Sequence, residues 1–314
     1  RISYQDISLI NKPKVIFLIG PTAAGKSEFA VRLAKKINGE IISADSVAVY
    51  RGMDIISSKP SMRLRKQILH RLIDIVTPSK EYNVAKFLKE ANKKIKEIIK
   101  RKKIPIVVGG SGLYIDSLLF GIFKEGVKDA VLRRRLEDEA RKYGSEYLYN
   151  RLKEIDPEAA EKIHPNNLRR VIRALEVCLL TKGKFSQIKQ KRNGLLDKYG
   201  VKIFGLNFER NKLYKKIDER VDKMFEQGLV KEVKGLLKKK LSKTARQALG
   251  IKEVGGYLVG EYDLERAKYF LKRNTRHFAK RQLTWFRRNK DIIWLDALQD
   301  KRKLLAEACT GLLK

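Results

Sequence analysis

Residues 14–27 read KVIFLIGPTAAGKS, an apolar run that leads directly into a glycine-rich loop. The apolar part, residues 14–19, is short and rich in β-branched residues, which is typical of a buried parallel strand. The loop fits the pattern GxxxxGK followed by Ser or Thr, and a helical stretch runs from Lys26 to about Ile37. Because the motif needs a strand before it and a helix after it, this stretch predicts a phosphate-binding loop (P-loop) that opens an α/β domain.

The P-loop is suited to hold the phosphates of a diphosphate or triphosphate. Its glycines let successive backbone N–H groups curve around an anion, and the N-terminus of the following helix adds partial positive charge. The Ser27 hydroxyl can ligate Mg²⁺, so Mg²⁺ is the expected cofactor. The residues expected to contact the diphosphate are Gly20, Pro21, Thr22, Ala23, Ala24, Gly25, Lys26 and Ser27. A glycine-rich turn with only a structural role is the alternative.

Strands and helices alternate along the rest of the chain. Short apolar runs at 40–43 and 104–108 predict two more buried strands, with a charged, periodic helix over 84–103 between them. Two later runs, 201–208 and 292–295, predict strands that return to the sheet. This alternation indicates a P-loop α/β fold, a parallel sheet flanked by helices with right-handed crossovers.

The stretch between residues 123 and 200 has a different character. It is highly charged, with helical patterns and few strand-like runs, and it predicts an inserted all-helical subdomain. The expected organisation is a first part of the α/β core over 1–122, the helical insertion over 123–200, and the second part of the core over 201–314.

The chain is strongly basic. Its 314 residues include 71 Lys and Arg against 36 Asp and Glu, a net charge of +35. Such a charge suits a polyanionic partner, because Lys and Arg that neutralise phosphates release counterions. Drift toward lysine in an AT-rich genome explains the same numbers, so charge alone leaves a nucleic-acid partner open.

Cysteine content and hydropathy narrow the class of protein. Cys178 and Cys309 form neither a disulfide framework nor a zinc-ligand spacing, which indicates a reducing compartment. No run approaches the roughly 18 apolar residues of a membrane helix, and residues 1–11 lack the features of a secretory signal. We expect a soluble cytoplasmic monomer with no membrane partner, or an organellar protein if a leader is missing.

A second motif follows the next predicted strand. It places Asp45 at the carboxyl end of that strand, the edge at which open α/β sheets bind ligands. From here the chain resembles the tRNA dimethylallyltransferase (tRNA isopentenyltransferase) family over nearly its whole length, with several blocks in the family's order. Beyond the P-loop these blocks are DSVAVYRGMDI (45–55), HRLID (70–74), VGGSGLY (108–114), HPNN (164–167), RVIRALEV (170–177), RQALG (246–250) and TRHFAKRQ (275–282).

The resemblance implies a reaction and roles for three residues. The family transfers a dimethylallyl group from dimethylallyl diphosphate to N6 of adenine 37, beside the tRNA anticodon, and releases diphosphate. Because this adenine lies in a folded loop, it must be flipped out of its stack for the reaction. Adenine N6 is a weak nucleophile, so a general base must accept its proton. The resemblance gives that role to Asp45. Arg220 would stabilise the leaving diphosphate with the P-loop. Ser111, where the family usually has Thr, would contact the adenine or help to place the catalytic groups.

Structural roles compete with each of these assignments. Asp45 with Ser46 fits a helix N-cap, and Ser111 fits a capping hydroxyl after a Gly-Gly turn. Read from the sequence alone, Arg220 is one basic residue among many on a helix.

The resemblance also implies contacts with the anticodon stem-loop of tRNA, where splayed bases and backbone are recognised. For Arg170 and Arg173, pairing with acids such as Glu176 is the alternative. The residues assigned to tRNA are Asp45, Ser46, Val47, Ala48, Arg169, Arg170, Arg173, Gln247, Ala248, Leu249, Gly250, Ile251, Lys252, Lys280 and Arg281.

Lys280 and Arg281 belong to a basic, aromatic helix predicted over 275–287. We expect this helix to face RNA on one side. On the other side we expect it to pack on the core through Phe278, Leu283 and Trp285.

The chain departs from the family pattern at several positions. Ala48 stands where Gln is common, and Ile251 stands where an aromatic residue is common. Residues 56–60 (ISSKP) replace an IGTAKP-like stretch, and no Cys/His cluster follows the last block. The changes at Ala48 and Ile251 weaken the tRNA contacts expected there. They leave intact the residues expected to bind diphosphate and Asp45, the expected general base.

Three other functions remain open from the sequence. An adenylate isopentenyltransferase acting on free AMP, ADP or ATP would share the P-loop and the Asp, but it would not need the HPNN and RALEV blocks. A P-loop kinase of a small molecule would consume ATP and would not need a basic RNA surface. A non-catalytic RNA-binding protein would not need an intact Lys26, Ser27, Asp45 and Arg220.

Overall fold

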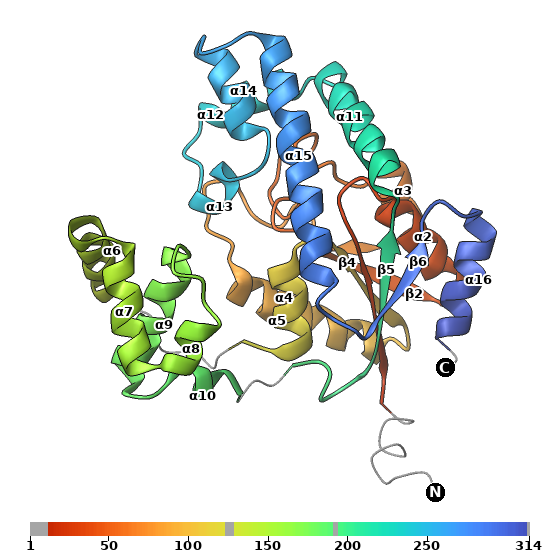
Figure 1. Ribbon diagram of the computed structural model, residues 1–314. Helices are drawn as coiled ribbons and strands as arrows, with labels where there is room; N and C mark the ends of the chain where they lie inside the picture. Colours follow the sequence, from red (N-terminus) through yellow and green to blue (C-terminus); the bar gives the residue numbers. More distant parts are fainter. Residues whose placement is uncertain (1–11, 123–128, 191–193, 313–314) are drawn as a thin grey trace, which may run out of the picture. The chain divides into compact units, whose positions relative to one another are not determined.

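The computed structural model describes residues 12–122, 129–190 and 194–312, with the side chains of 188–190 left aside. The chain divides into two compact units. The first consists of Arg1–Leu119 with Leu195–Lys314, and the second of Phe120–Gly194. Each unit is described by itself (Figure 1).

The first unit is built on a parallel six-stranded sheet in the order β3-β2-β4-β1-β5-β6. The central strand β1 pairs with β4 through Ile16 and Ile106, and with β5 through Lys14 and Gly200. Near-continuous apolar runs form these central strands because both faces of the sheet are covered by helices. The strands are β1 (Lys14–Ile19), β2 (Gly39–Ala44), β3 (His70–Arg71), β4 (Ile104–Gly109), β5 (Gly200–Asn207) and β6 (Ile292–Asp296).

Helices α2, α4 and α16 pack directly on the sheet. The core cluster joins Leu18 and Phe204 of the sheet to Phe29 and Leu33 of α2 and to Leu304 of α16. Helix α4 packs on β2 and β4. The helices of the first unit are α2 (Lys26–Lys36), α3 (Met62–Gln67), α4 (Val84–Lys100), α5 (Gly112–Phe120), α11 (Arg210–Glu226), α12 (Leu229–Leu237), α13 (Lys243–Arg246), α14 (Ile251–Leu258), α15 (Leu264–Phe286) and α16 (Lys301–Gly311).

The second unit is helical. Its core contains the fully buried Leu136, Leu148, Leu152 and Leu175. The buried carboxylate of Asp156 accepts hydrogen bonds from Ser186. The helices are α6 (Ala130–Tyr143), α7 (Ser145–Ile155), α8 (Pro157–Glu161), α9 (Leu168–Thr181) and α10 (Phe185–Gln190).

The two points at which the chain leaves and rejoins the first unit are hydrogen-bonded to each other. The amide of Leu195 donates to the carbonyl of Leu118 at 3.0 Å, and the amide of Leu196 donates to that of Leu119 at 3.3 Å. The chain therefore returns to the first unit several residues before β5 begins, which is why the helical unit ends at 194 and not at the expected 200.

The predicted fold class is confirmed, and all five strands expected from apolar runs are present. The sequence did not predict β3, which has only two residues and pairs with β2 at the edge of the sheet. The helix expected over 84–103 ends at Lys100. Within the described residues, no helix is long and apolar enough to cross a membrane.

Candidate active site

The P-loop curves because three of its residues have positive φ angles. These are Gly20 (147°), Ala23 (64°) and Gly25 (83°). At Gly20 a Cβ atom would lie 3.0 Å from the carbonyl oxygen and 3.3 Å from the Cβ of Leu206, so this position also needs glycine for space. Among the described residues, no side chain caps the N-terminus of α2. Its first N–H groups therefore suit an anion.

Lys26 folds back over the P-loop. Its Nζ donates to the carbonyl oxygens of Gly20 at 3.0 Å and Pro21 at 2.6 Å. Burial lowers the pKa of Lys26 to about 7, with Arg220 acting in the same direction and Asp45 opposing it. A negatively charged ligand in the loop would favour the protonated ammonium.

Asp45 lies where β2 ends, beside the Gly-Gly turn that follows β4. The strands are neighbours, with Ala44 opposite Gly109. Asp45 Oδ1 accepts the amides of Val47 at 2.8 Å and Ala48 at 3.1 Å, which caps a turn and not the helix N-terminus considered from the sequence. Its Oδ2 has no hydrogen-bond partner among the described residues. One oxygen therefore holds the turn, and the other remains able to accept a proton.

Ser111 contacts the same turn. Its Oγ accepts the amide of Ser46 at 3.2 Å. The hydroxyl thus links the segment after β4 to the segment after β2. This is a positioning contact of the kind that the sequence left open, and it is made one residue from Asp45.

Arg220 approaches the P-loop from α11. Its Nη1 donates to Thr22 Oγ1 at 2.9 Å, and its Nε donates to Ser58 Oγ at 2.8 Å. Burial lowers the pKa of Arg220, and the charge of Asp45 acts against that effect. The structure therefore distinguishes Arg220 from the many exposed basic residues by its half-buried position and by its contact with the loop.

Lys26, Asp45 and Arg220 line one cavity of about 450 Å³, and Ser111 is not among its lining residues. A volume of this size suits a small ligand. The polar lining includes Lys26, Ser27, Asp45 and Arg220, and apolar lining includes Ala48, Ile73 and Phe278. A second cavity of about 980 Å³ adjoins it and shares Ser58, Lys59 and Arg220.

Comparison with known proteins identifies the family. The family model for IPP transferases matches residues 48–289, and a model for isopentenyl transferases matches residues 13–73. The chain belongs to the IPP transferase family. It is 50% identical to a tRNA dimethylallyltransferase of Halothermothrix orenii, over 93% of this chain and 90% of that protein. It is 48% identical to one from Acetivibrio thermocellus, over 90% of this chain and 91% of that protein.

Solved structures of family members have the same fold. A tRNA isopentenylpyrophosphate transferase from Bacillus halodurans superposes with a TM-score of 0.72 at 40% identity, covering 96% of this chain and 97% of its own. A eukaryotic dimethylallyltransferase acting on tRNA superposes with a TM-score of 0.79 at 32% identity, covering 96% of this chain and 78% of its own.

Gln282 is a site residue whose role could not be seen in the sequence. Its Oε1 accepts the amide of Thr22 and its Nε2 donates to the carbonyl of Gly110, both at 2.9 Å. This buried side chain of the IPP transferase thus joins the P-loop to the turn that carries Ser111. The only signal in the sequence was its place in the block TRHFAKRQ.

The residues assigned to tRNA in the first unit separate into exposed and buried groups. The side chains of Gln247, Lys252, Lys280 and Arg281 are exposed, and those of Ser46, Val47 and Leu249 are half-buried. Ala48, Ala248 and Ile251 are only 3%, 6% and 3% exposed, and Gly250 is buried. These four residues are buried with their backbone included, so they present little surface to RNA, although Ala48 lines the cavity beside Asp45.

The three arginines assigned to tRNA in the second unit lie on α9. Arg169 and Arg170 are exposed. Arg173 Nη1 lies 2.6 Å from the buried carboxylate of Glu176, which is the alternative considered for it. Arg173 therefore has a structural role, whereas Arg169 and Arg170 present their side chains to solvent.

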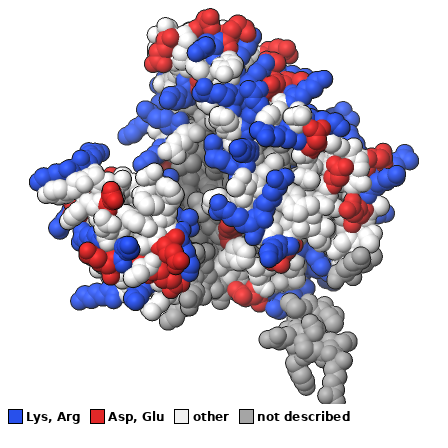
Figure 2. Space-filling model, in the orientation of Figure 1, with Lys and Arg blue, Asp and Glu red and all other residues white. Residues whose placement is uncertain are grey.

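The basic helix expected over 275–287 is the C-terminal part of α15. Its buried side chains are Ala279, Gln282 and Phe286, and Trp285 is 37% exposed. The expectation that Trp285 lies in the core was wrong, because its ring covers Gly112 and its Nε1 donates to Asp116 at the surface. On the face drawn in Figure 2, Lys and Arg side chains gather over α11 and α15.

The oxygen donors around the P-loop are few. The described residues hold no group of three or more His, Cys, Asp or Glu placed to bind a metal ion. Ser27 supplies a hard oxygen in the cavity, and Asp45 lines the same cavity. Mg²⁺ usually binds through one or two protein oxygens and the phosphates of a substrate, so this sparse set fits a metal that arrives with a diphosphate.

Proposed function

We propose that this chain transfers the dimethylallyl group of dimethylallyl diphosphate to N6 of adenine 37 in the anticodon stem-loop of tRNA, with release of diphosphate. The observation that carries the proposal is that Asp45 lines the same cavity of about 450 Å³ as the P-loop and Arg220. A proton acceptor and an anion-binding loop therefore face one small space. The names of the relatives, tRNA dimethylallyltransferases, support the same reaction.

The proposed step is a substitution at C1 of the donor. The N6 lone pair of the flipped adenine attacks C1 of the dimethylallyl group, and the C1–O bond breaks with its electron pair going to the diphosphate oxygen. The N6 proton passes to the unpartnered Oδ2 of Asp45. The amides of the P-loop, Lys26 and Arg220 stabilise the charge that develops on the diphosphate.

We place the diphosphate in the P-loop and Mg²⁺ at the Ser27 hydroxyl. The curved loop with its uncapped helix N-terminus supports the first part. When bound, Mg²⁺ would neutralise charge on the leaving diphosphate. Ser111 would hold the turn that carries Asp45, since it is bonded to Ser46.

We propose that tRNA contacts exposed basic side chains on each of the two units. These are Arg169 and Arg170 on α9, Lys252 on α14, and Lys280 and Arg281 on α15. Each can neutralise a phosphate and release its counterion. We further propose that the protein works as a monomer in the cytoplasm, which light scattering and cell fractionation would test.

A transfer assay tests the function directly. Radiolabelled dimethylallyl diphosphate and Mg²⁺ are incubated with unmodified tRNA carrying adenine 37, with the same tRNA carrying guanine there, and with AMP or ATP. We expect label only in the first tRNA. Label in AMP or ATP would assign the protein to free nucleotides, and label in the guanine variant would refute adenine N6 as the acceptor.

A further inference from the structure

Arg220 is held by two hydroxyl groups. Its Nε donates to Ser58 Oγ at 2.8 Å and its Nη1 donates to Thr22 Oγ1 at 2.9 Å. In the described part of the chain it forms no ion pair, since no carboxylate oxygen lies within 4.0 Å of it. Two neutral acceptors on two edges of the planar guanidinium fix its orientation without cancelling its charge.

The chemistry of the Ser58 hydroxyl fits this role. A guanidinium can only donate, so Ser58 Oγ must accept from Arg220 and its own hydrogen must go elsewhere. The carbonyl of Ile55 lies 3.4 Å away and the sulfur of Met224 lies 3.8 Å away, and either can take it. The hydroxyl is therefore oriented with its lone pair toward Arg220.

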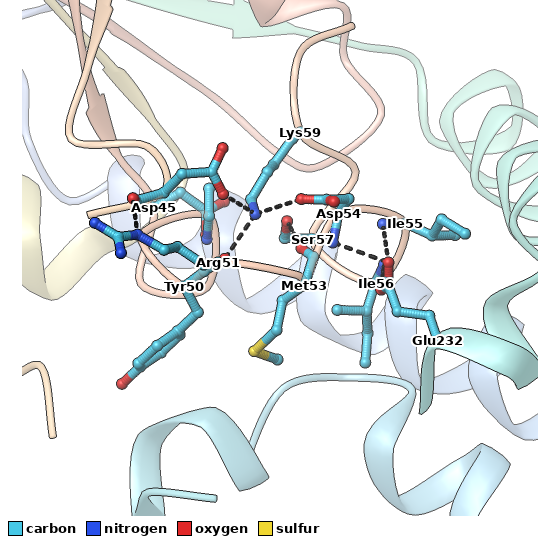
Figure 3. A network of polar contacts seen from close by, with 12 residues as sticks. Asp45, Tyr50, Arg51, Met53, Asp54, Ile55, Ile56, Ser57, Lys59 and Glu232 are labelled. Atoms are coloured by element: carbon cyan, nitrogen blue, oxygen red, sulfur yellow. Dashed lines mark hydrogen bonds and ion pairs between the residues drawn. The ribbon is translucent and has the colours of Figure 1, made fainter. Parts of the chain in front are cut away.

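The loop that carries Ser58 is fixed at both sides. The Glu232 carboxylate of α12 accepts the amides of three successive residues, Asp54, Ile55 and Ile56, at 2.9–3.0 Å. On the other side, Lys59 Nζ lies 2.6 Å from Asp54 Oδ1 and donates to the carbonyl of Tyr50, also at 2.6 Å (Figure 3). The Lys59 side chain is 4% exposed, whereas its partner Asp54 is 64% exposed.

Ser58 itself has a backbone conformation that is uncommon for a residue other than glycine. Its φ is 47°, in the left-handed region that non-glycine residues adopt uncommonly. Glycine would adopt this conformation with less strain. Ser58 and Arg220 also line both cavities, the one of about 450 Å³ and the one of about 980 Å³.

We infer that Ser58 is a positioning residue, whose hydroxyl holds the Arg220 guanidinium toward the P-loop so that it meets the donor's diphosphate. This inference rests on the proposed function. Thr22 is the second acceptor and fixes the other edge of the guanidinium. Removal of the Ser58 hydroxyl keeps the charge of Arg220 but removes one of the two contacts that fix the orientation of its guanidinium.

The experiment compares Ser58→Gly and Ser58→Ala with the full-length wild-type protein. Ser79→Ala is the control, because Ser79 is exposed and lines neither cavity. Measurements are kcat and KM for dimethylallyl diphosphate with tRNA, inhibition by inorganic pyrophosphate, and the thermal unfolding midpoint. Each Ser58 change is also made in an Arg220→Ala background.

We expect both Ser58 variants to lower kcat/KM for the donor about tenfold and to weaken pyrophosphate inhibition by a similar factor. Ser58→Gly should do so without lowering the unfolding midpoint, because it removes backbone strain. In the Arg220→Ala background the Ser58 changes should have no further effect. Wild-type kinetics in Ser58→Gly, a full additional loss in the Arg220→Ala background, or an equal loss in Ser79→Ala would each overturn the inference.

The two proposals fail in different ways. If the wild-type protein transfers no dimethylallyl group, the proposed function fails. Calorimetric titration of inorganic pyrophosphate into the same variants would still measure whether Ser58 and Arg220 act as one unit on a diphosphate.

Discussion

Gln282 and Gly110 are in contact through a hydrogen bond that leaves no room for a side chain at position 110. Gln282 Nε2 donates to the Gly110 carbonyl at 2.9 Å, and a Cβ atom on Gly110 would lie 2.2 Å from Nε2. The other end of Gln282 accepts the amide of Thr22. Helix α15 thus sets the spacing between the P-loop and the segment that holds Asp45 in place.

The first prediction concerns this connection. Gln282→Leu keeps the volume but leaves the buried carbonyl of Gly110 and the half-buried amide of Thr22 without their partner. The buried carbonyl should cost about 1–3 kcal/mol of unfolding free energy, and the amide should cost less. We also expect kcat/KM to fall about tenfold or more, since the two loops lose their spacing. Urea unfolding and the transfer assay measure both effects. Gln67→Leu, at an exposed position of α3, is the control, and a Gln282→Leu enzyme with full activity would contradict the positioning role.

Asp45→Asn separates chemistry from folding. The amide oxygen can still accept from Val47 and Ala48, so the turn should remain, but the group can no longer take a proton. We expect kcat to fall about 10²–10⁴-fold. Inorganic pyrophosphate should still bind with wild-type affinity. Retained kcat would rule out Asp45 as the base, whereas lost pyrophosphate binding would indicate damage to the whole site.

Gly112 and Trp285 give a prediction about packing. A Cβ on Gly112 would lie 2.6 Å from Trp285 Cδ1, so Gly112→Ala should displace the ring and break the bond from Trp285 Nε1 to Asp116. We expect a loss of about 1–3 kcal/mol in stability and a change in tryptophan fluorescence. Gly235→Ala in α12, where no atom of the described residues lies within 4 Å of the added Cβ, should instead gain about 0.5–1 kcal/mol. Equal effects from the two substitutions would show that the ring moves freely.

The buried Glu176 predicts an acid-sensitive helical unit. Burial alone would raise the pKa of Glu176, but hydrogen bonds from Arg133, Arg173 and the amide of Asp129 outweigh it and hold the pKa below its usual value of 4.5. The carboxylate therefore stabilises the unit above the unfolded-state pKa, and this contribution is lost as the pH falls through the lower folded-state pKa.

Glu176→Gln should accordingly cost about 3 kcal/mol at pH 7, because two guanidinium groups lose their partner. The cost should shrink as the pH falls through the pKa of the carboxyl group, since the wild type then also loses its charge. Chemical unfolding followed by circular dichroism at about pH 7 and about pH 3.5 measures the difference. Glu154→Gln, at an exposed position of α7, serves as the control, and a cost independent of pH would contradict this role of the carboxylate.

The proposed RNA surface predicts a change in salt dependence. Replacing the exposed Arg169 and Arg170 by Ala should weaken tRNA binding and reduce the slope of log K against log salt by about 0.7–0.9 for each phosphate that is no longer neutralised. Filter binding at several salt concentrations measures the slope. Lys35→Ala with Lys36→Ala removes the same charge from an exposed part of α2 and should leave the slope nearly unchanged. Equal slopes for both pairs would mean that only total charge matters.

The sequence predicted the parts of this protein that depend on local order along the chain. The P-loop, the apolar strands and the position of Asp45 at a strand end follow from residues that are neighbours or nearly so. The contacts of Gln282 with Thr22 and of Arg220 with Ser58 join positions 260 and 162 residues apart. Many Gln and Arg residues have the same local pattern, so only the folded sheet and the packing of α11 and α15 on it identify these two.

Burial on the individual faces of helices was also beyond the sequence. Ile251 and Trp285 both have large apolar side chains, yet Ile251 is 3% exposed and Trp285 is 37% exposed. The difference arises because the Trp285 ring lies over a glycine at the surface and has a carboxylate for its N–H. The hydrophobicity of the helix sequence alone could not predict that Gly112 and Asp116 lie beside Trp285.

The paired amides at Leu195 and Leu196 have a consequence for how such a chain can change over time. They donate hydrogen bonds to the carbonyls of Leu118 and Leu119, so the chain leaves the first unit and returns to it at adjacent positions. An ancestor could gain, exchange or lose those helices while the sheet kept its register. The helical unit could therefore change in sequence while the P-loop, Asp45 and Arg220 of the first unit keep their places.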